Sequence, residues 1–223
     1  MVSPSANTTY YLTETITATG CTNMDSVNVT VNPLPAANAG APSTICQLAT
    51  TNIGAAAVIG NTYSWTSNPA GFTDTNSNPM VAPMATTKYY ITETITATGC
   101  MNMDSVIVTV NPIPAANASA SRGLCIGDST DLGAATTAGH TYSWTSMPAG
   151  FTSTVSNPKV WPNTTTKYYL TEVITATGCT NMDSVTITVN PLPAAAVGIP
   201  KSVCAGSTDS IGAPAVPGNT YSW

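Results

Sequence analysis

Six cysteines are the residues of this chain whose type and spacing could do chemistry. They form two series, each with a spacing of 79 residues: Cys21, Cys100 and Cys179, and Cys46, Cys125 and Cys204. The chain has no Cys-x-x-Cys pair and only one histidine, so the spacing does not fit a zinc site. Paired cysteines at fixed positions are typical of disulfides formed in an oxidising compartment.

Acidic residues are a second candidate for chemistry. Glu93 lies in a pattern Tyr-x-Ile-x-Glu-x-Ile, on the apolar side of an expected strand, and Glu14 and Glu172 are its copies. If the next hairpin turns at Thr98 and Gly99, Glu93 would lie opposite Asp104, and the pair could bind calcium. Calcium prefers six to eight oxygens, so a bulge or an exposed strand end explains the glutamate better.

The residues give no catalytic group. His140 is the only histidine, and its equivalents 79 residues away are Asn61 and Asn219, so loop variation explains it better than a catalytic triad. Trp161 stands where the previous repeat has Ala82, which suggests a surface or interdomain contact, or part of a platform on which a sugar could stack. We predict neither an enzyme, nor a metal site, nor a cofactor.

The elements that must position these residues recur with the same period. A stretch Thr-Ala-Thr-Gly-Cys-x-Asn-Met-Asp-Ser-Val occurs three times without insertion or deletion, which predicts a tandem array. We expect complete repeats at 35–113 and 114–192, the C-terminal half of a repeat at 1–34, and the N-terminal half of a repeat at 193–223. Because Met1 aligns with Met80, inside a repeat, we interpret the chain as a window from a longer protein.

Short segments of period two, bounded by Gly, Pro, Asn and Asp, predict antiparallel strands and no helices. In residues 61–67, Tyr63 and Trp65 alternate with small polar residues, so both should face the core. The predicted central core residues are Trp65, Trp144 and Trp223. The fold class is therefore all-β, with β-sandwich repeats in a linear array joined by short Asn-Pro-Leu-Pro or Asn-Pro-Ile-Pro linkers.

Charge and hydropathy exclude some partners. Charged residues make up 7% of the chain, with 5 basic against 10 acidic side chains, so no basic groove for nucleic acid can form. No apolar run in this chain is long enough to span a membrane.

Together, the Ile-Cys near the start of a repeat, Thr-Tyr-Ser-Trp, Thr-Thr-x-Tyr-Tyr, Gly-Cys and Asp-Ser-Val-x-Val-Thr-Val-Asn-Pro carry a resemblance. The chain resembles the immunoglobulin-like and PKD-like tandem repeats of secreted surface proteins of Bacteroidetes, such as gliding-motility-type adhesins exported by the type IX route. This resemblance implies tandem immunoglobulin-like sandwiches on the cell exterior. It also implies a stalk, an adhesin or a filament.

Two disulfide patterns are compatible with the repeats. Spacing favours a bond inside each repeat, Cys46 with Cys100 and Cys125 with Cys179, which leaves Cys21 and Cys204 to pair outside the chain. In an immunoglobulin-like domain, however, the turn after the first strand and the last hairpin lie at opposite ends, so Cys46 could instead reach Cys179. Bridged Cα atoms lie within about 7 Å, so the two patterns exclude each other.

The Asp-Ser-Val copies are candidate modification sites. Ser26, Ser105 and Ser184 follow an aspartate and precede an apolar residue, which resembles the O-glycosylation acceptor of the same bacteria. Alternatively, Asp and Ser only begin a strand and bond to turn amides.

These patterns predict a non-enzymatic, extracellular structural or adhesive region that forms a semi-rigid rod on the bacterial surface. Its partners would be neighbouring repeats or protomers of the same protein, and surface glycans or other cells. Two other functions remain: a self-assembling filament completed by strand addition, and the spacer or carbohydrate-binding part of a secreted hydrolase.

Overall fold

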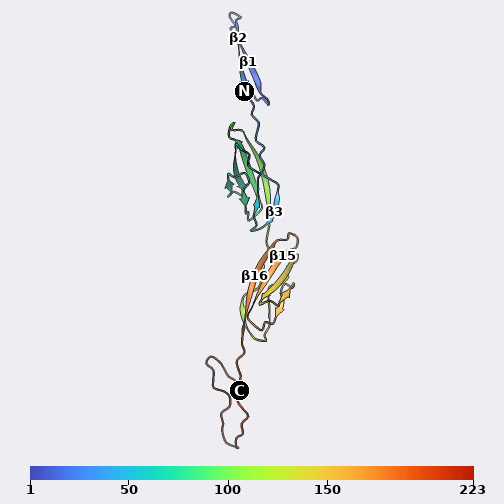
Figure 1. Cartoon of the computed structure of the whole chain (residues 1–223), viewed down its shortest axis with the longest axis vertical. Coiled ribbons are helices and arrows are strands. Elements are labelled where there is room, and N and C mark those ends of the chain that lie inside the picture. Colours follow the sequence, from blue (N-terminus) through green and yellow to red (C-terminus); the bar gives the residue numbers. More distant parts are fainter. The chain divides into compact units, whose positions relative to one another are not determined.

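The computed structural model describes all residues, 1–223, as β-strands and connecting loops with no helix (Figure 1). The chain divides into two compact units, one of residues 1–114 and 176–179, the other of residues 115–175 and 180–223. Each unit contains one complete sandwich.

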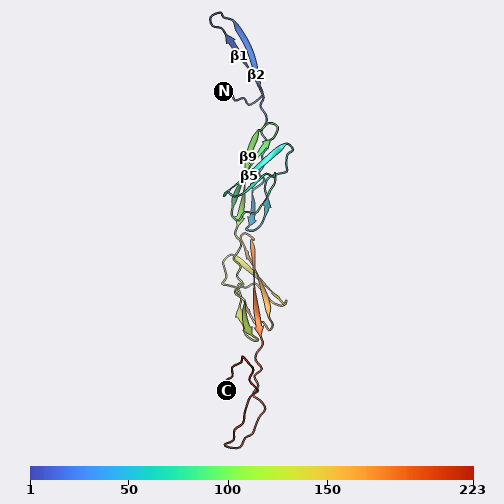
Figure 2. The ribbon, with the colours of Figure 1, turned by 90° about the vertical axis from the view of Figure 1, so that its left-hand side faces the viewer.

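The first sandwich is built from seven strands. They are β3 (Ser43–Cys46), β4 (Thr51–Asn52), β5 (Asn61–Asn68), β6 (Thr73–Asp74), β7 (Met80–Val81), β8 (Thr87–Ile95) and β9 (Met101–Asn111). One layer is a five-stranded sheet in the order β3-β9-β8-β5-β6, and β4 pairs with β7 in the other (Figure 2). β3 runs parallel to β9, whereas the other pairs are antiparallel.

The second sandwich repeats this plan 79 residues later. Its strands are β10 (Arg122–Cys125), β11 (Thr130–Asp131), β12 (His140–Met147), β13 (Thr152–Ser153), β14 (Lys159–Val160), β15 (Thr166–Ile174) and β16 (Thr180–Asn190). The five-stranded sheet has the order β10-β16-β15-β12-β13, and β11 pairs with β14.

Each sandwich has its own hydrophobic core because alternate residues of its strands point inward. The centre is Trp65 in the first core and Trp144 in the second, each with 1% of its surface exposed. Their indole Nε1 groups donate hydrogen bonds to the carbonyl oxygens of Asn76 and Val155, both at 2.9 Å. The predictions for Trp65 and Trp144 are therefore confirmed.

The remaining segments contain only parts of this plan. Residues 1–34 form one hairpin, β1 (Thr8–Thr15) with β2 (Thr22–Val29), and residues 193–223 contain no strand (Figure 1). Trp223 is 75% exposed, so the prediction that it lies in a core is wrong for this structure. The physical reason is that its own segment does not supply the residues that cover Trp65 in the complete repeat.

Candidate functional site

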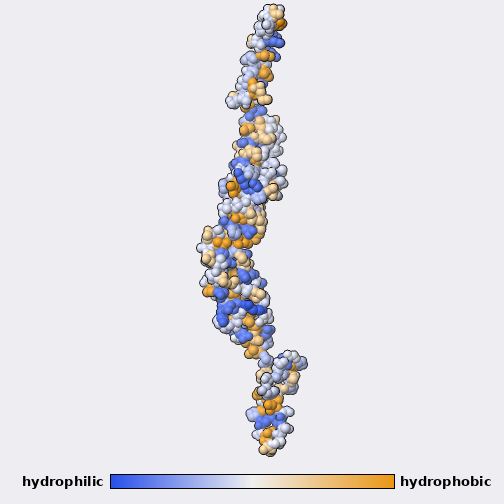
Figure 3. All heavy atoms as spheres, turned by 180° about the vertical axis from the view of Figure 1, so that it is seen from behind, coloured by the Kyte–Doolittle hydropathy of each residue, from blue (hydrophilic) through white to orange (hydrophobic).

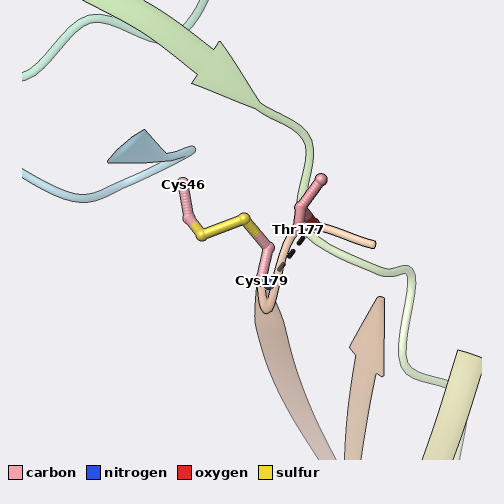
Figure 4. Close-up of a disulfide and its surroundings, with 3 residues drawn as sticks. All are labelled: Cys46, Thr177 and Cys179. Atoms are coloured by element: carbon pink, nitrogen blue, oxygen red, sulfur yellow. Dashed lines mark hydrogen bonds between the residues drawn. A yellow bond between two sulfur atoms is a disulfide. The ribbon is translucent and has the colours of Figure 1, made fainter. Parts of the chain in front are cut away.

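The clearest chemical feature of the structure is a disulfide between Cys46 and Cys179 (Figure 4). Their Cα atoms are 5.6 Å apart, and the two residues are 133 positions apart in the sequence. Both cysteines belong to the first compact unit, because that unit includes residues 176–179. By sequence, however, Cys46 belongs to the repeat 35–113 and Cys179 to the repeat 114–192, so the bond joins two consecutive repeats covalently.

Two local structures place these sulfur atoms. Cys46 is the last residue of β3, where it lies beside Asn111 at the end of β9, and the Ala49 amide donates to the Cys46 carbonyl oxygen at 3.0 Å to begin a turn. Cys179 is fully buried in the turn between β15 and β16. Its amide donates to Thr177 Oγ1 at 3.3 Å, which holds the turn closed (Figure 4).

The bond corrects the predicted pairing of Cys46 with Cys100. Cys46 lies beside Asn111 at one end of β9, whereas Cys100 precedes Met101 at the other end. Eleven strand residues span about 35 Å, several times the reach of a disulfide. The two cysteines of one repeat therefore lie at opposite ends of the same strand and cannot bond.

The same geometry rules out the predicted bond between Cys125 and Cys179. Cys125 lies beside Asn190 at the far end of β16, while Cys179 precedes the start of that strand. Four cysteines are free: Cys21, Cys125 and Cys204 are exposed, and Cys100 is half-buried. The pairing of Cys21 and Cys204 outside the chain stays a prediction.

The structure also corrects the predicted position of the repeated glutamate. The hairpin turns through Thr96–Gly99, with the Ile95 amide donating to the Cys100 carbonyl oxygen at 2.9 Å, so Glu93 lies opposite Asn102 and not Asp104. Glu93 is only 3% exposed, so neither the calcium pair nor the exposed strand end is correct.

A buried polar pair takes the place of the expected carboxylate pair. In the first repeat, Asn61 Nδ2 donates to Glu93 Oε1 at 2.6 Å. In the second, His140 Nδ1 lies 2.7 Å from Glu172 Oε1. His140 therefore lies in β12 as the partner of a buried glutamate, and not in a variable loop. Sequence reasoning missed this pair, although Asn61 and His140 occupy equivalent positions.

Asp104 has a structural partner that the sequence also did not reveal. Its Oδ2 accepts a hydrogen bond from the Ala39 amide at 2.8 Å, and Asp183 Oδ2 accepts one from the Ala118 amide at the same distance. Each aspartate thereby fixes the segment that leads into its repeat. The adjacent serines differ in exposure: Ser105 and Ser184 are half-buried, while Ser26 is exposed.

The tyrosines of the cores stay neutral at ordinary pH. Burial raises the pKa of Tyr89 and of Tyr168 above the usual 10.0, and hydrogen bonds with Thr87 and Thr166 act in the opposite direction with smaller effect. Tyr89 packs edge to face on Phe72 with ring centroids 5.2 Å apart. These phenols therefore serve as packing groups.

Trp161 is the one large aromatic that a sandwich displays on its surface for no internal reason. It is exposed beside β14, and Lys159 Nζ lies 5.9 Å from the centre of its ring. The structure contains no group of three or more His, Cys, Asp or Glu residues that could hold a metal ion. It also contains no helix that is long and apolar enough to cross a membrane.

The comparisons agree with this architecture. Residues 114–191 match the model of a family described as "Ig-like domain CHU_C associated". Residues 35–113 have the same strand order and register as this segment. The chain is a tandem of immunoglobulin-like domains.

Solved structures with similar arrangements have low sequence identity. A titin tandem is 14% identical, with a TM-score of 0.37, over 86% of this chain and 76% of that chain. A titin I-band fragment is 11% identical, with a TM-score of 0.33, over 69% of this chain. The match spans 64% of the fragment's own length. The fibronectin(III)-like modules of Clostridium thermocellum CbhA are 10% identical, with a TM-score of 0.30, over 68% of this chain and 90% of that chain. No curated protein matches the chain in sequence.

Proposed function

We propose that this chain is a non-enzymatic, extracellular structural region whose tandem domains act as a load-bearing spacer on a bacterial surface. The observation that carries the proposal is the disulfide between Cys46 and Cys179, which joins residues of two consecutive repeats. Its bond has no catalytic neighbours. Its consequence is mechanical, because the 132 residues between the two cysteines form a closed covalent loop.

Three further features support this function. Disulfides persist in oxidising environments, which favours a location outside the cytosol. Each repeat has its own core, so repeats can be added without changing their neighbours. The linker around Pro112 and Pro114 is short, and proline restricts its backbone, which favours a semi-rigid connection. Adhesion to surface glycans or to other cells would use exposed side chains such as Trp161.

Stretching single molecules of the chain from both ends tests this role. With the disulfide intact, unfolding of both repeats does not extend residues 47–178. A reductant should therefore add about 460 Å to the extended length, at roughly 3.5 Å per residue. The variant Cys100→Ser should behave like the unmodified chain, because Cys100 is free.

Two outcomes would refute the mechanical role. If a reductant adds no length, the bond carries no load between the repeats. A gain of about 190 Å would instead correspond to the 54 residues from Cys46 to Cys100, and thus to a bond inside one repeat. Labelling of intact cells of the source organism with an antibody to the chain tests the location: surface labelling is expected, and labelling only after lysis would contradict it.

A further inference from the structure

The two terminal segments of this chain contain complementary parts of the same domain. By the 79-residue period, residues 1–34 correspond to residues 80–113, which contain β7, β8 and β9. Residues 193–223 correspond to residues 35–65, which contain β3, β4 and most of β5. Together the two segments supply a whole repeat except for the equivalents of residues 66–79.

Side chains that form the core in a complete repeat are exposed in both segments. Leu12 is 67% exposed whereas its equivalent Ile91 is 1% exposed, and Val27 is 60% exposed whereas its equivalent Val106 is 2% exposed. In the C-terminal segment the apolar side chains that lack cover are Val197, Ile211, Tyr221 and Trp223. Figure 3 shows hydrophobic atoms open on this segment, at the bottom of the view.

The C-terminal segment nevertheless retains local structure of a complete repeat. The Gly212 amide donates to the Val197 carbonyl oxygen at 3.2 Å, as the Gly54 amide does to the Ala39 oxygen at 2.8 Å. The Val216 amide donates to Tyr221 Oη at 2.7 Å, which reproduces the 2.7 Å bond from Val58 to Tyr63 Oη.

The hollow in this segment is where the missing hairpin packs in a complete repeat. An open space of about 460 Å³ is lined by Val197, Gly212, Tyr221 and Trp223, among others. The Trp223 ring lies against Gly212 as the Trp65 ring lies against Gly54. The tryptophan therefore already lies on the same glycine as in a finished domain and lacks only the strands that would cover it.

The N-terminal hairpin is equally close to its form in a complete repeat. β1 and β2 pair in the register of β8 and β9, since Thr8 lies opposite Val29 as Thr87 lies opposite Val108. The Ile16 amide donates to the Cys21 carbonyl oxygen at 2.9 Å to close its turn.

We propose that the N-terminal hairpin of one copy of this chain completes the C-terminal segment of a second copy, so that the two form a composite immunoglobulin-like domain. In the register of β5 and β8, Trp223 of one copy would lie opposite Leu12 of the other, as Trp65 lies opposite Ile91. Asn219 would reach Glu14, as Asn61 reaches Glu93. The composite domain lacks β6 and the Asn76 carbonyl that binds the indole of Trp65, so it is less stable than a complete repeat.

The cysteines supply the covalent part of the proposal. Cys46 and Cys179 show that the first-strand cysteine of one repeat bonds the hairpin cysteine of the next. In the composite arrangement the same relation joins Cys125 of one copy to Cys21 of the next, and Cys204 to Cys100. All four free cysteines are then paired, and copies join head to tail.

Formation of these bonds needs an electron acceptor, for which a small-molecule disulfide is sufficient. One thiolate attacks that disulfide and forms a mixed disulfide, which releases one small thiol. The second cysteine then displaces the other small thiol. Two protein thiols lose two protons and two electrons in total, and the small disulfide is reduced to two thiols.

Light scattering after size-exclusion chromatography tests association of the whole 223-residue chain. In reductant that leaves the free thiols unpaired, the chain should form oligomers whose mass rises with concentration. Leu12→Glu and Ile211→Asp each place a charge on a face that becomes buried, so each variant alone should be monomeric. The matched controls Thr13→Glu and Ser210→Asp change neighbouring exposed positions and should assemble like the unmodified chain.

Mixing the two defective variants separates this proposal from nonspecific adhesion. Leu12→Glu retains an intact C-terminal segment, and Ile211→Asp retains an intact hairpin, so the mixture should give a one-to-one dimer and nothing larger. A monomeric unmodified chain at every concentration, full assembly of either variant, or no dimer in the mixture would each overturn the proposal.

Oxidation with oxidised glutathione tests the covalent part. Assembled chains should yield linked peptides that contain Cys21 with Cys125 and Cys100 with Cys204, and these links should be lost from Leu12→Glu alone. Recovery of the four cysteines in any other pairs overturns the predicted register. Neither result bears on whether the repeats carry load, which the stretching experiment measures.

Discussion

Gly54 shows how closely one residue can be constrained by this fold. Its φ is +84°, and a Cβ atom there would lie 2.1 Å from the Ser77 carbonyl oxygen and 2.9 Å from the Trp65 ring. Gly60 has a similar φ of +87°, but a Cβ atom there would meet nothing within 4 Å. The two glycines therefore separate the cost of backbone conformation from the cost of a clash.

We expect Gly54→Ala to destabilise the first repeat by more than about 3 kcal/mol, because it adds a steric clash to the conformational cost. Gly60→Ala should cost only about 1–2 kcal/mol, the cost of a left-handed conformation alone. Hydrogen exchange on peptides from β8 and β9 measures both values. Equal effects of the two substitutions would show that the close contact with Trp65 and Ser77 is not present.

The buried glutamate is constrained by its hydrogen-bond partner. Glu172→Ala should destabilise the second repeat by about 1–3 kcal/mol, because it leaves the half-buried ring of His140 without its acceptor. His140→Asn recreates the pair of Asn61 with Glu93 and should change stability by less than about 1 kcal/mol. Hydrogen exchange of β12 and β15 reports both variants. A large loss in His140→Asn would contradict the equivalence of the two pairs.

At the scale of elements, each lead-in segment depends on an aspartate of the last strand. Asp104→Ala removes the acceptor of the Ala39 amide, so we expect a loss of about 1–2 kcal/mol and faster hydrogen exchange at residues 36–40. Ser105→Ala is the control, because it changes the neighbouring residue of the same Asp-Ser-Val stretch. If Asp104→Ala left exchange at residues 36–40 unchanged, the aspartate would not hold this segment.

The elements could be predicted from the sequence wherever a pattern is local. Alternation around Trp65 and along Val106 and Val108 correctly indicated core-facing strands, because side-chain direction in a strand depends only on neighbours in the chain. The register of β8 with β9 could not be predicted, since it depends on whether the turn contains two residues or four. A shift of two residues moved Glu93 away from Asp104.

The disulfide could not be predicted because it depends on distance across the fold. The spacing of Cys46 and Cys100 along the chain is shorter than that of Cys46 and Cys179, yet the eleven residues of β9 separate the first pair. Only the parallel pairing of β3 with β9 places Cys46 at the far end of that strand. A sequence pattern gives no direct sign of this pairing.

At the scale of the whole molecule, the disulfide should stabilise the repeats without being needed for either core. Cys179→Ser should lower stability against unfolding of both repeats by about 2–5 kcal/mol, because the open chain gains entropy when unfolded. Trp65 and Trp144 should stay buried in the folded variant, as tryptophan fluorescence can show. Cys100→Ser is the control and should leave stability unchanged. Loss of the native fluorescence in Cys179→Ser would contradict independent cores.

The most direct test of this account is a disulfide map of the chain under non-reducing conditions. A protease that cleaves before aspartate places the six cysteines on six different peptides. The account predicts a cross-linked pair of residues 25–73, which carry Cys46, and residues 131–182, which carry Cys179. Linkage of residues 25–73 to residues 74–103, which carry Cys100, would contradict it.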